Sequence, residues 1–183
     1  VQEAAAVYCD RIVGHAGQGD CVVDKLPMNY LNLGIASMIL PNARVLHIVR
    51  NPLDTALSCF SNSFASQMSF TADLEHLGHA IVQQRRIMKH WAAVVDLPIL
   101  EVRYESLAAS PESTLREVVN FLDLPWSDDL LRFHESKRVA ATPSMDQVRE
   151  PINTSAVDRA SAFQDHLSPL RAALGLQEAA PPS

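Results

Sequence analysis

Cysteine is scarce in this chain of 183 residues, which contains only Cys9, Cys21 and Cys59. No C-x-x-C pair occurs, so the spacing excludes a disulfide scaffold and gives no sign of a zinc or redox site. We expect three buried thiols among apolar neighbours. Unpaired cysteines are typical of a reducing compartment, which favours a cytoplasmic protein.

Long hydrophobic runs and excess positive charge are also lacking. The longest apolar stretch, around Leu31 to Leu40, is interrupted by Gly34 and Ser37 and falls short of the about 18 to 20 residues that span a bilayer. The formal net charge of −6 argues against general affinity for nucleic acid or an anionic membrane. Any anion must therefore be bound in a local pocket.

What is present is a composition typical of a globular protein, with 48% hydrophobic residues. We predict one domain over residues 1–177 and a frayed Ala/Pro-rich tail over residues 178–183. The helical pattern begins at Val1 without an initiator Met, so we expect that upstream sequence is not included here or has been removed by processing.

Apolar periodicity and turn residues predict helices that alternate with short strands. The predicted helices cover residues 1–16, 30–40, 53–62, 73–95, 110–122, 127–135 and 167–174, with Asn29, Asn51 and Ser110 as N-caps. The predicted strands cover residues 21–23, 44–49 and 99–104, and the run RVLHIV suits a strand buried on both faces. Residues 63–71 are expected to form a loop, and residues 138–153 are expected to be extended.

This alternation indicates an α/β fold with a parallel sheet flanked by helices. Ligands of such sheets bind beyond the carboxyl ends of the strands. Lys25 and Arg50 both follow predicted strands, so both are candidate anion-binding residues.

The residues that follow the strand at 44–49 suit a phosphate dianion. Arg50 offers a guanidinium fork, Asn51 and Pro52 begin a helix, and Ser58 offers a hydroxyl on that helix. The alternative is structural: Arg50 caps the sheet through Asp54, and Ser58 is a small residue that faces the core. The spacing alone leaves both readings open.

The surrounding sequence DKLPMNYLNLGIASMILPNARVLHIVRNPLDTALSCF resembles sulfotransferases that use 3′-phosphoadenosine 5′-phosphosulfate (PAPS), in their bacterial and tyrosylprotein-sulfotransferase-like branch. The family has a P-loop-NTPase-like three-layer sandwich. Its element strand-Arg-[Asn/Asp]-Pro-x-Asp-x-x-x-Ser binds the donor's 3′-phosphate, which implies Arg50 and Ser58 here.

Downstream strings resemble the same family in the same order. VRYESLAASPESTLREVVNFLDLPW implies that Tyr104 contacts the donor nucleotide, the alternative being a half-buried strand aromatic. ATPSMDQVREPIN resembles the loop that folds over the nucleotide, which implies Ser144, Gln147 and Arg149. Arg159 stands where a basic residue completes the phosphate cage, although Ala160 replaces the usual Trp; the alternative is a solvated helix residue.

The resemblance gives Lys25 a catalytic role. Sulfuryl transfer, like phosphoryl transfer, passes through a loose transition state with negative charge on the leaving oxygen, and an ammonium group beside that oxygen lowers the barrier. The alternative for Lys25 is an ion pair with Asp24 or another carboxylate.

Two parts expected of the family are not found in the sequence. No Gly-x-Pro-Arg-Ser-Gly-Thr-like loop for the 5′-phosphosulfate occurs, and Leu26 and Pro27 follow Lys25 where cytosolic relatives carry a His base. We therefore expect the N-terminal strand-loop-helix and the general base, a Glu in the tyrosylprotein-like branch, to lie upstream of Val1, and this fragment alone to be potentially inactive.

The prediction is a PAPS-dependent sulfotransferase that acts without a metal on a hydroxyl or amine of a small molecule or peptide. One alternative is a non-catalytic nucleotide-binding or interaction domain derived from such an enzyme. Another, a P-loop kinase, is disfavoured because no G-K-[ST] sequence or clear magnesium-binding pair occurs.

Overall fold

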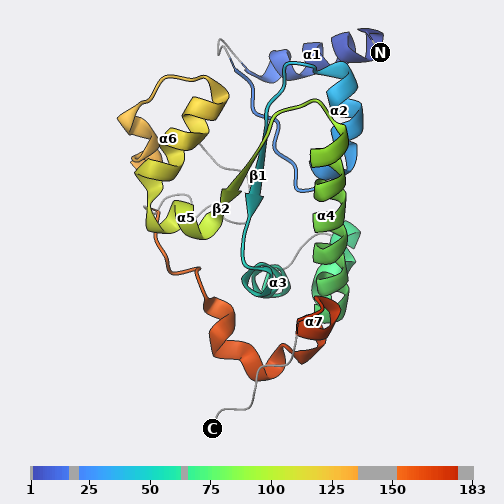
Figure 1. The fold of residues 1–183 in the computed structure, drawn as a ribbon, viewed down its shortest axis with the longest axis vertical. Coiled ribbons are helices and arrows are strands. Elements are labelled where there is room, and N and C mark those ends of the chain that lie inside the picture. The colour runs from blue at the N-terminus through green and yellow to red at the C-terminus, as the bar shows by residue number, and fades with distance from the viewer. Residues whose placement is uncertain (1, 17–20, 63–65, 136–151, 177–183) are drawn as a thin grey trace. The chain divides into compact units, whose positions relative to one another are not determined.

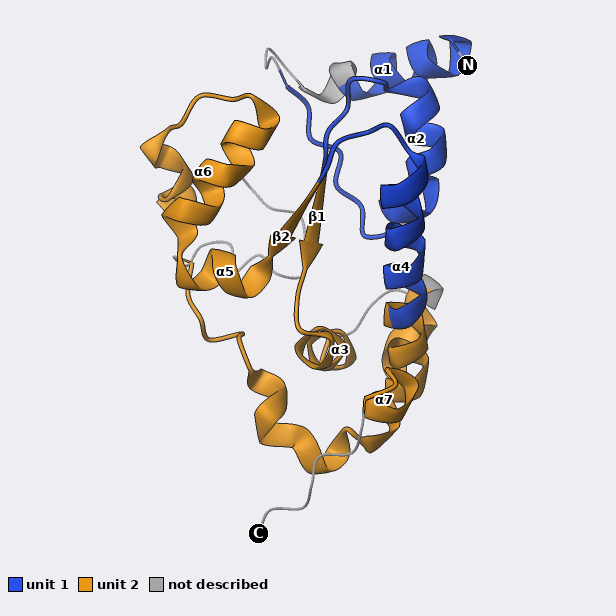
Figure 2. Cartoon of the chain, viewed as in Figure 1, with its two compact units in different colours: residues 1–45, 82–99 blue, residues 46–81, 100–183 orange. Residues whose placement is uncertain are grey.

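A computed structural model describes residues 2–16, 21–62, 66–135 and 152–176. The chain forms two compact units, and it contributes two separate stretches to each (Figure 2). Unit 1 comprises Val1–Val45 and Val82–Ile99, and unit 2 comprises Leu46–Ile81 and Leu100–Ser183.

Unit 1 is helical. It contains α1 (Gln2–Ala16), the short 3-10 helix η1 (Asn29–Asn32), α2 (Leu33–Ile39) and the second part of α4 (Leu74–Val94). These helices lie close to their predicted positions (Figure 1).

The contact between Gly34 of α2 and Trp91 of α4 organises unit 1. An ideal Cβ atom on Gly34 would lie 2.8 Å from the indole ring of Trp91, so only glycine allows this approach. The indole Nε1 of Trp91 donates to the backbone oxygen of Tyr30 at 2.7 Å. Among the described residues of this unit, the buried apolar side chains are those of Leu33, Met88 and Leu97.

The predicted strand at residues 21–23 is wrong. Residues 21–26 have no regular secondary structure, and the Val23 side chain is 82% exposed. An apolar run becomes a strand only when its backbone pairs with a neighbour, and no pairing strand lies beside it among the described residues. Cys21 in this segment and Cys9 in α1 are exposed, which corrects the expectation of buried thiols; Cys59 is partly buried.

The sheet consists of two neighbouring strands in the described part of the chain, β1 (Val45–Val49) and β2 (Ile99–Arg103), which run parallel (Figure 1). This confirms helices combined with a parallel sheet; the three-layer P-loop-like sandwich remains a prediction. Burial along β1 alternates, with Leu46 38% and Ile48 55% exposed, so the expectation of two buried faces is wrong. A pleated strand has both faces buried only where layers cover both.

Two helices follow β2 in unit 2. The helix α5 (Tyr104–Ala109) was not predicted, whereas α6 (Pro111–Leu122) was, with Pro111 in its first turn. Ser110 precedes α6, but its side chain makes no capping hydrogen bond.

The core of unit 2 forms where α3 (Pro52–Phe60) meets the first part of α4, the 3-10 helix η6 (Arg159–His166) and α7 (Ser168–Ala173) (Figure 1). Its buried members are Ala56, Leu57, Leu77, Ala160, Leu167 and Leu170. The core therefore joins the helix after β1 to the C-terminal part of the described chain.

The described residues also include three further short 3-10 helices. These are η2 (Ser66–Ala72), η3 (Asp128–Leu130) and η4 (Phe133–Glu135), of which η2 falls in the predicted loop and the other two in the predicted helix at 127–135. Within the described ranges, no helix combines the length and apolarity needed to cross a membrane.

Candidate functional site

The candidate site lies at the carboxyl end of β1, where Asn51 begins α3. The Asn51 side-chain oxygen accepts from the backbone N–H groups of Leu53 (2.9 Å) and Asp54 (3.4 Å), as its predicted N-cap role requires. The Asn51 backbone N–H itself donates to a carboxylate oxygen of Glu105 at 2.6 Å. These three N–H groups are therefore bonded within the chain, and the predicted N-cap role of Asn51 is confirmed.

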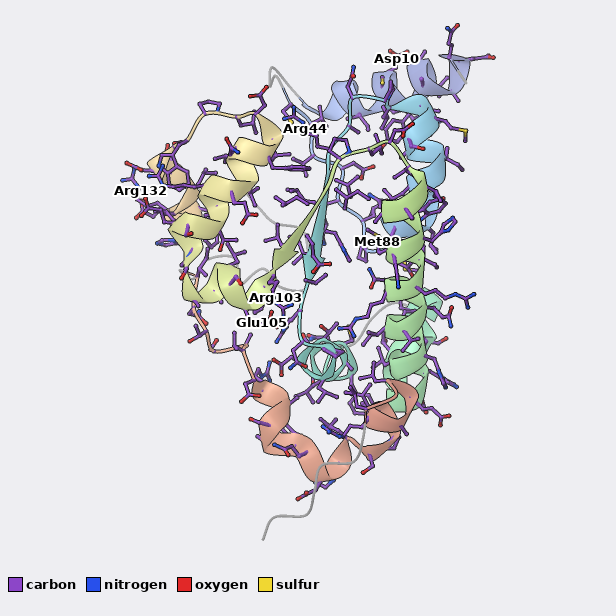
Figure 3. All side chains as sticks on the ribbon, viewed as in Figure 1. Asp10, Arg44, Met88, Arg103, Glu105 and Arg132 are labelled. Atoms are coloured by element: carbon purple, nitrogen blue, oxygen red, sulfur yellow. The ribbon has the colours of Figure 1, made fainter. Side chains whose placement is uncertain are left out.

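Glu105 lies just beyond the end of β2, next to Arg103 (Figure 3). Its bond to Asn51 ties the ends of the two parallel strands together. Its second carboxylate oxygen is buried and has no hydrogen-bond partner among the described residues.

Arg50 makes contacts on two sides. Its Nη2 donates to the backbone oxygen of Ala156, and its Cζ lies 4.7 Å from the centroid of the Tyr104 ring. Its Nε is buried and has no hydrogen-bond partner in the described part of the chain. A buried guanidinium N–H without a partner costs free energy, so this group suits an added acceptor.

Asp54 does not pair with Arg50, so the structural alternative proposed for Arg50 is not what the structure shows. The Asp54 side chain is 2% exposed, and its two oxygens accept from the backbone N–H groups of Asp158 (2.7 Å) and Ala160 (2.8 Å). Asp54 thus binds the segment that carries Arg159.

Arg159 is exposed and is the first residue of η6. Asp158 before it has a left-handed backbone with φ of 58°, which turns the chain into η6. The bond from Arg50 to Ala156 and the bonds from Asp54 bring this segment to the end of β1 and the start of α3.

Tyr104 is half-buried and begins α5, so it is not the strand aromatic of the alternative reading. Ser58 is half-buried near the end of α3, and its backbone oxygen accepts from Asn62 at 2.6 Å. Burial raises the pKa of the neighbouring Cys59 thiol, and the positive charge of Arg50 offsets part of this rise. No hydrogen bond joins the Ser58 hydroxyl to Arg50 among the described contacts.

Lys25 belongs to unit 1, where it is exposed. The alternative partner Asp24 is used elsewhere, because it accepts from the Tyr8 hydroxyl at 2.5 Å and from the Asn29 amide at 3.3 Å. Lys25 has no ion pair within the described residues. The Asn29 side chain donates this hydrogen bond to Asp24 and caps no helix, so the prediction of Asn29 as an N-cap is wrong.

Ser144, Gln147 and Arg149 lie outside the described residues, so their predicted roles stay predictions. Across the described ranges, no group of three or more His, Cys, Asp or Glu residues could hold a metal ion. His76 and His79 of α4 instead lie near the carboxylates of Asp73 and Glu75 on an exposed face.

Sequence reasoning missed Glu105 and the backbone of Ala156, and it gave Asp54 the wrong partner. A signal existed for two of them, because Asp54 is the acidic residue of the strand-Arg-[Asn/Asp]-Pro-x-Asp element and Glu105 follows Tyr104 in the R-Y-E string. The Ala156 contact involves a main-chain oxygen, which leaves no trace in the sequence.

Comparison with known proteins identifies the family of the chain. The profile of the sulfotransferase family matches residues 1–128, and the chain belongs to that family. An uncharacterized protein of Aquifex aeolicus is 36% identical over 173 residues, which cover 93% of this chain and 23% of that protein.

Two animal relatives are named for their activity. Protein-tyrosine sulfotransferase A of Caenorhabditis elegans is 26% identical over 80% of this chain, and protein-tyrosine sulfotransferase of Drosophila melanogaster is 25% identical over 87% of it. The matches cover 40% and 34% of those proteins. The chain therefore spans less than half the length of these relatives.

Proposed function

We propose that this chain binds PAPS and carries the 3′-phosphate subsite of a PAPS-dependent sulfotransferase. The observation that carries the proposal is the buried Nε of Arg50, a guanidinium donor at the carboxyl end of a parallel strand with no partner among the described residues. Phosphate oxygens accept strong charge-assisted bonds from such a group.

The contacts of Arg50 suit this role because they fix the orientation of its side chain. Nη2 is bound to Ala156, and the guanidinium lies over the Tyr104 ring. A planar guanidinium held in this way loses little side-chain entropy when an anion binds. Ser58, Arg159 and the predicted residues Ser144, Gln147 and Arg149 would complete the nucleotide site with Tyr104.

The proposed reaction moves a sulfuryl group from PAPS to a hydroxyl or amine of a small molecule or peptide. The acceptor oxygen or nitrogen forms a bond to sulfur as the bond from sulfur to the bridging phosphate oxygen breaks, and the acceptor proton passes to a general base. Adenosine 3′,5′-bisphosphate leaves with the bonding electron pair. Lys25 would stabilise the negative charge that develops on the leaving oxygen.

Isothermal titration calorimetry with adenosine 3′,5′-bisphosphate tests the binding site. We expect Arg50→Ala to weaken binding by more than about tenfold, because it removes a charge-assisted contact to the phosphate. Arg44→Ala is the matched control, because Arg44 is an exposed arginine at the opposite end of the same strand: Arg44 precedes β1, and Arg50 follows β1. Unchanged affinity in Arg50→Ala would sink the assignment.

Turnover separates an enzyme from a binding domain. The release of adenosine 3′,5′-bisphosphate from PAPS, with water or a phenol as acceptor, is expected to require Lys25. Tight nucleotide binding without any such release is expected both of the non-catalytic alternative and of a catalytic chain whose general base lies outside these residues.

A further inference from the structure

Asp54 is a buried carboxylate whose hydrogen-bond partners lie outside its own helix, α3. It is 2% exposed, and its oxygens accept from the N–H groups of Asp158 and Ala160, more than a hundred residues along the chain. No basic side chain forms a salt bridge with it in the described part of the protein. Burying a carboxylate is costly unless hydrogen bonds replace water, so these two bonds strongly specify where residues 158–160 lie.

A second bond holds the same segment. Arg50 donates to the backbone oxygen of Ala156, and Arg50 and Asp54 flank the start of α3. We define residues 156–160 as the strap. One end of the strap is held by the arginine and the other by the aspartate, and Arg159 lies between the two N–H groups that Asp54 binds.

We infer that Asp54 is a positioning residue of the 3′-phosphate subsite, which holds the strap so that Arg159 can contact the same phosphate as Arg50. The inference rests on the proposed function. A charged side chain on a fixed segment binds an anion more tightly than one on a segment that must first be ordered. Both Asp54 oxygens accept bonds from the strap, so Asp54 would act on the phosphate through Arg159 and not by direct contact.

The test compares two nucleotides in the whole chain. Adenosine 3′,5′-bisphosphate carries the 3′-phosphate and adenosine 5′-phosphate lacks it, so the ratio of their dissociation constants measures the 3′-phosphate subsite alone. Asp54→Asn keeps the size of the side chain but replaces one acceptor oxygen by an amide that cannot accept. We expect affinity for the bisphosphate to fall at least about tenfold, with affinity for adenosine 5′-phosphate unchanged.

Asp73→Asn is the matched control. Asp73 is an exposed aspartate that also accepts from a backbone N–H, that of His76 at 2.8 Å, but within its own turn of chain. Both dissociation constants should stay at their wild-type values in this variant.

A double-mutant cycle with Arg159→Ala separates positioning from general damage to the fold. If Asp54 acts through Arg159, adding Asp54→Asn to Arg159→Ala should change bisphosphate affinity less than about twofold. Fully additive losses would overturn the inference, as would an equal loss of affinity for both nucleotides in Asp54→Asn.

Hydrogen exchange on the wild-type chain gives an answer even if Asp54→Asn does not fold. The amide protons of Asp158 and Ala160 should gain protection with the bisphosphate and not with adenosine 5′-phosphate. Equal protection by both nucleotides contradicts the role of Asp54. If the wild-type chain does not bind the bisphosphate, both the proposed function and this inference fail. If wild type and Asp54→Asn bind the bisphosphate equally well, only the inference fails.

Discussion

The guanidinium of Arg50 lies over the ring of Tyr104, with 4.7 Å between Cζ and the ring centroid. These residues directly follow the two parallel strands, Arg50 after β1 and Tyr104 after β2. The pair therefore joins the two strand ends by a contact between side chains, beside the bond from Asn51 to Glu105.

Replacing Tyr104 tests the contribution of its ring. Tyr104→Phe should bind adenosine 3′,5′-bisphosphate nearly as well as wild type if the ring face supports Arg50, whereas Tyr104→Leu should lose about 0.5–2 kcal/mol of binding free energy. Calorimetry measures both. Trp126→Leu is the control, because it removes a similar arginine–aromatic pair, with Arg116 Cζ 4.1 Å from the Trp126 ring, elsewhere in unit 2. Equal affinities in Tyr104→Leu and wild type would contradict this prediction.

Lys25 should affect turnover and not product binding. In Lys25→Ala we expect the rate of PAPS cleavage to fall by about a hundredfold to a thousandfold, as for other groups that stabilise charge in the transition state. Affinity for adenosine 3′,5′-bisphosphate should change little. Lys89→Ala, which alters an exposed lysine of α4, provides the control. A loss of product affinity as large as the loss of rate would show that Lys25 binds the nucleotide instead.

The Tyr8 phenol should lose its proton at an unusually high pH. Its hydrogen bond to Asp24, together with burial and the charge of Asp24, raises its pKa to about 12. The protonated phenol is the donor, so its contribution to stability is complete below the unfolded pKa of about 10 and is lost as pH rises through about 12.

Absorbance titration can detect this group because the chain has only three tyrosines. The latest step should disappear in Tyr8→Phe and move to lower pH in Asp24→Asn. A curve in Tyr8→Phe that keeps this late step would refute the assignment.

Gly78 is expected to tolerate no side chain. An ideal Cβ atom there would lie 2.5 Å from the Cβ of Ala173 and 3.2 Å from the backbone oxygen of Leu170. Although alanine normally stabilises a helix relative to glycine, Gly78→Ala should lower the free energy of unfolding by about 1–3 kcal/mol. Ala173→Gly added to it should recover part of the loss. Gln83→Ala on the exposed face of α4 should change stability by less than about 0.5 kcal/mol.

The elements around Arg50 could be predicted because their signals are local. An apolar run gave β1, and Asn51 followed by Pro52 gave the start of α3, where the asparagine caps two N–H groups as expected. The helix α5 could not be found in this way, because it begins at Tyr104 directly after β2 without a side-chain cap. The apolar run at residues 21–23 led to a wrong strand prediction, because an apolar composition does not reveal whether a pairing strand is present.

The site was predictable in its side chains and not in its main-chain contacts. Arg50 and Tyr104, expected separately from two strings, are brought together in the structure. The strap was missed because its contacts use the backbone atoms of Ala156, Asp158 and Ala160, and any residue except proline presents the same N–H. Hydrogen bonds between main-chain atoms and side chains far apart in sequence produce no periodic pattern in the sequence.

Anchoring through main-chain atoms has an evolutionary consequence for residues 156–160. Substitutions at exposed positions of this segment, such as Arg159, can alter charge while the backbone bonds to Asp54 remain, whereas Ala160 is buried in the core of unit 2. A deletion or insertion, by contrast, would shift both N–H groups out of register with one carboxylate. The segment should therefore keep its length among relatives, because its anchoring depends on the spacing of backbone N–H groups, and Arg159 offers a position where nucleotide binding can be altered without removing the bonds to Asp54.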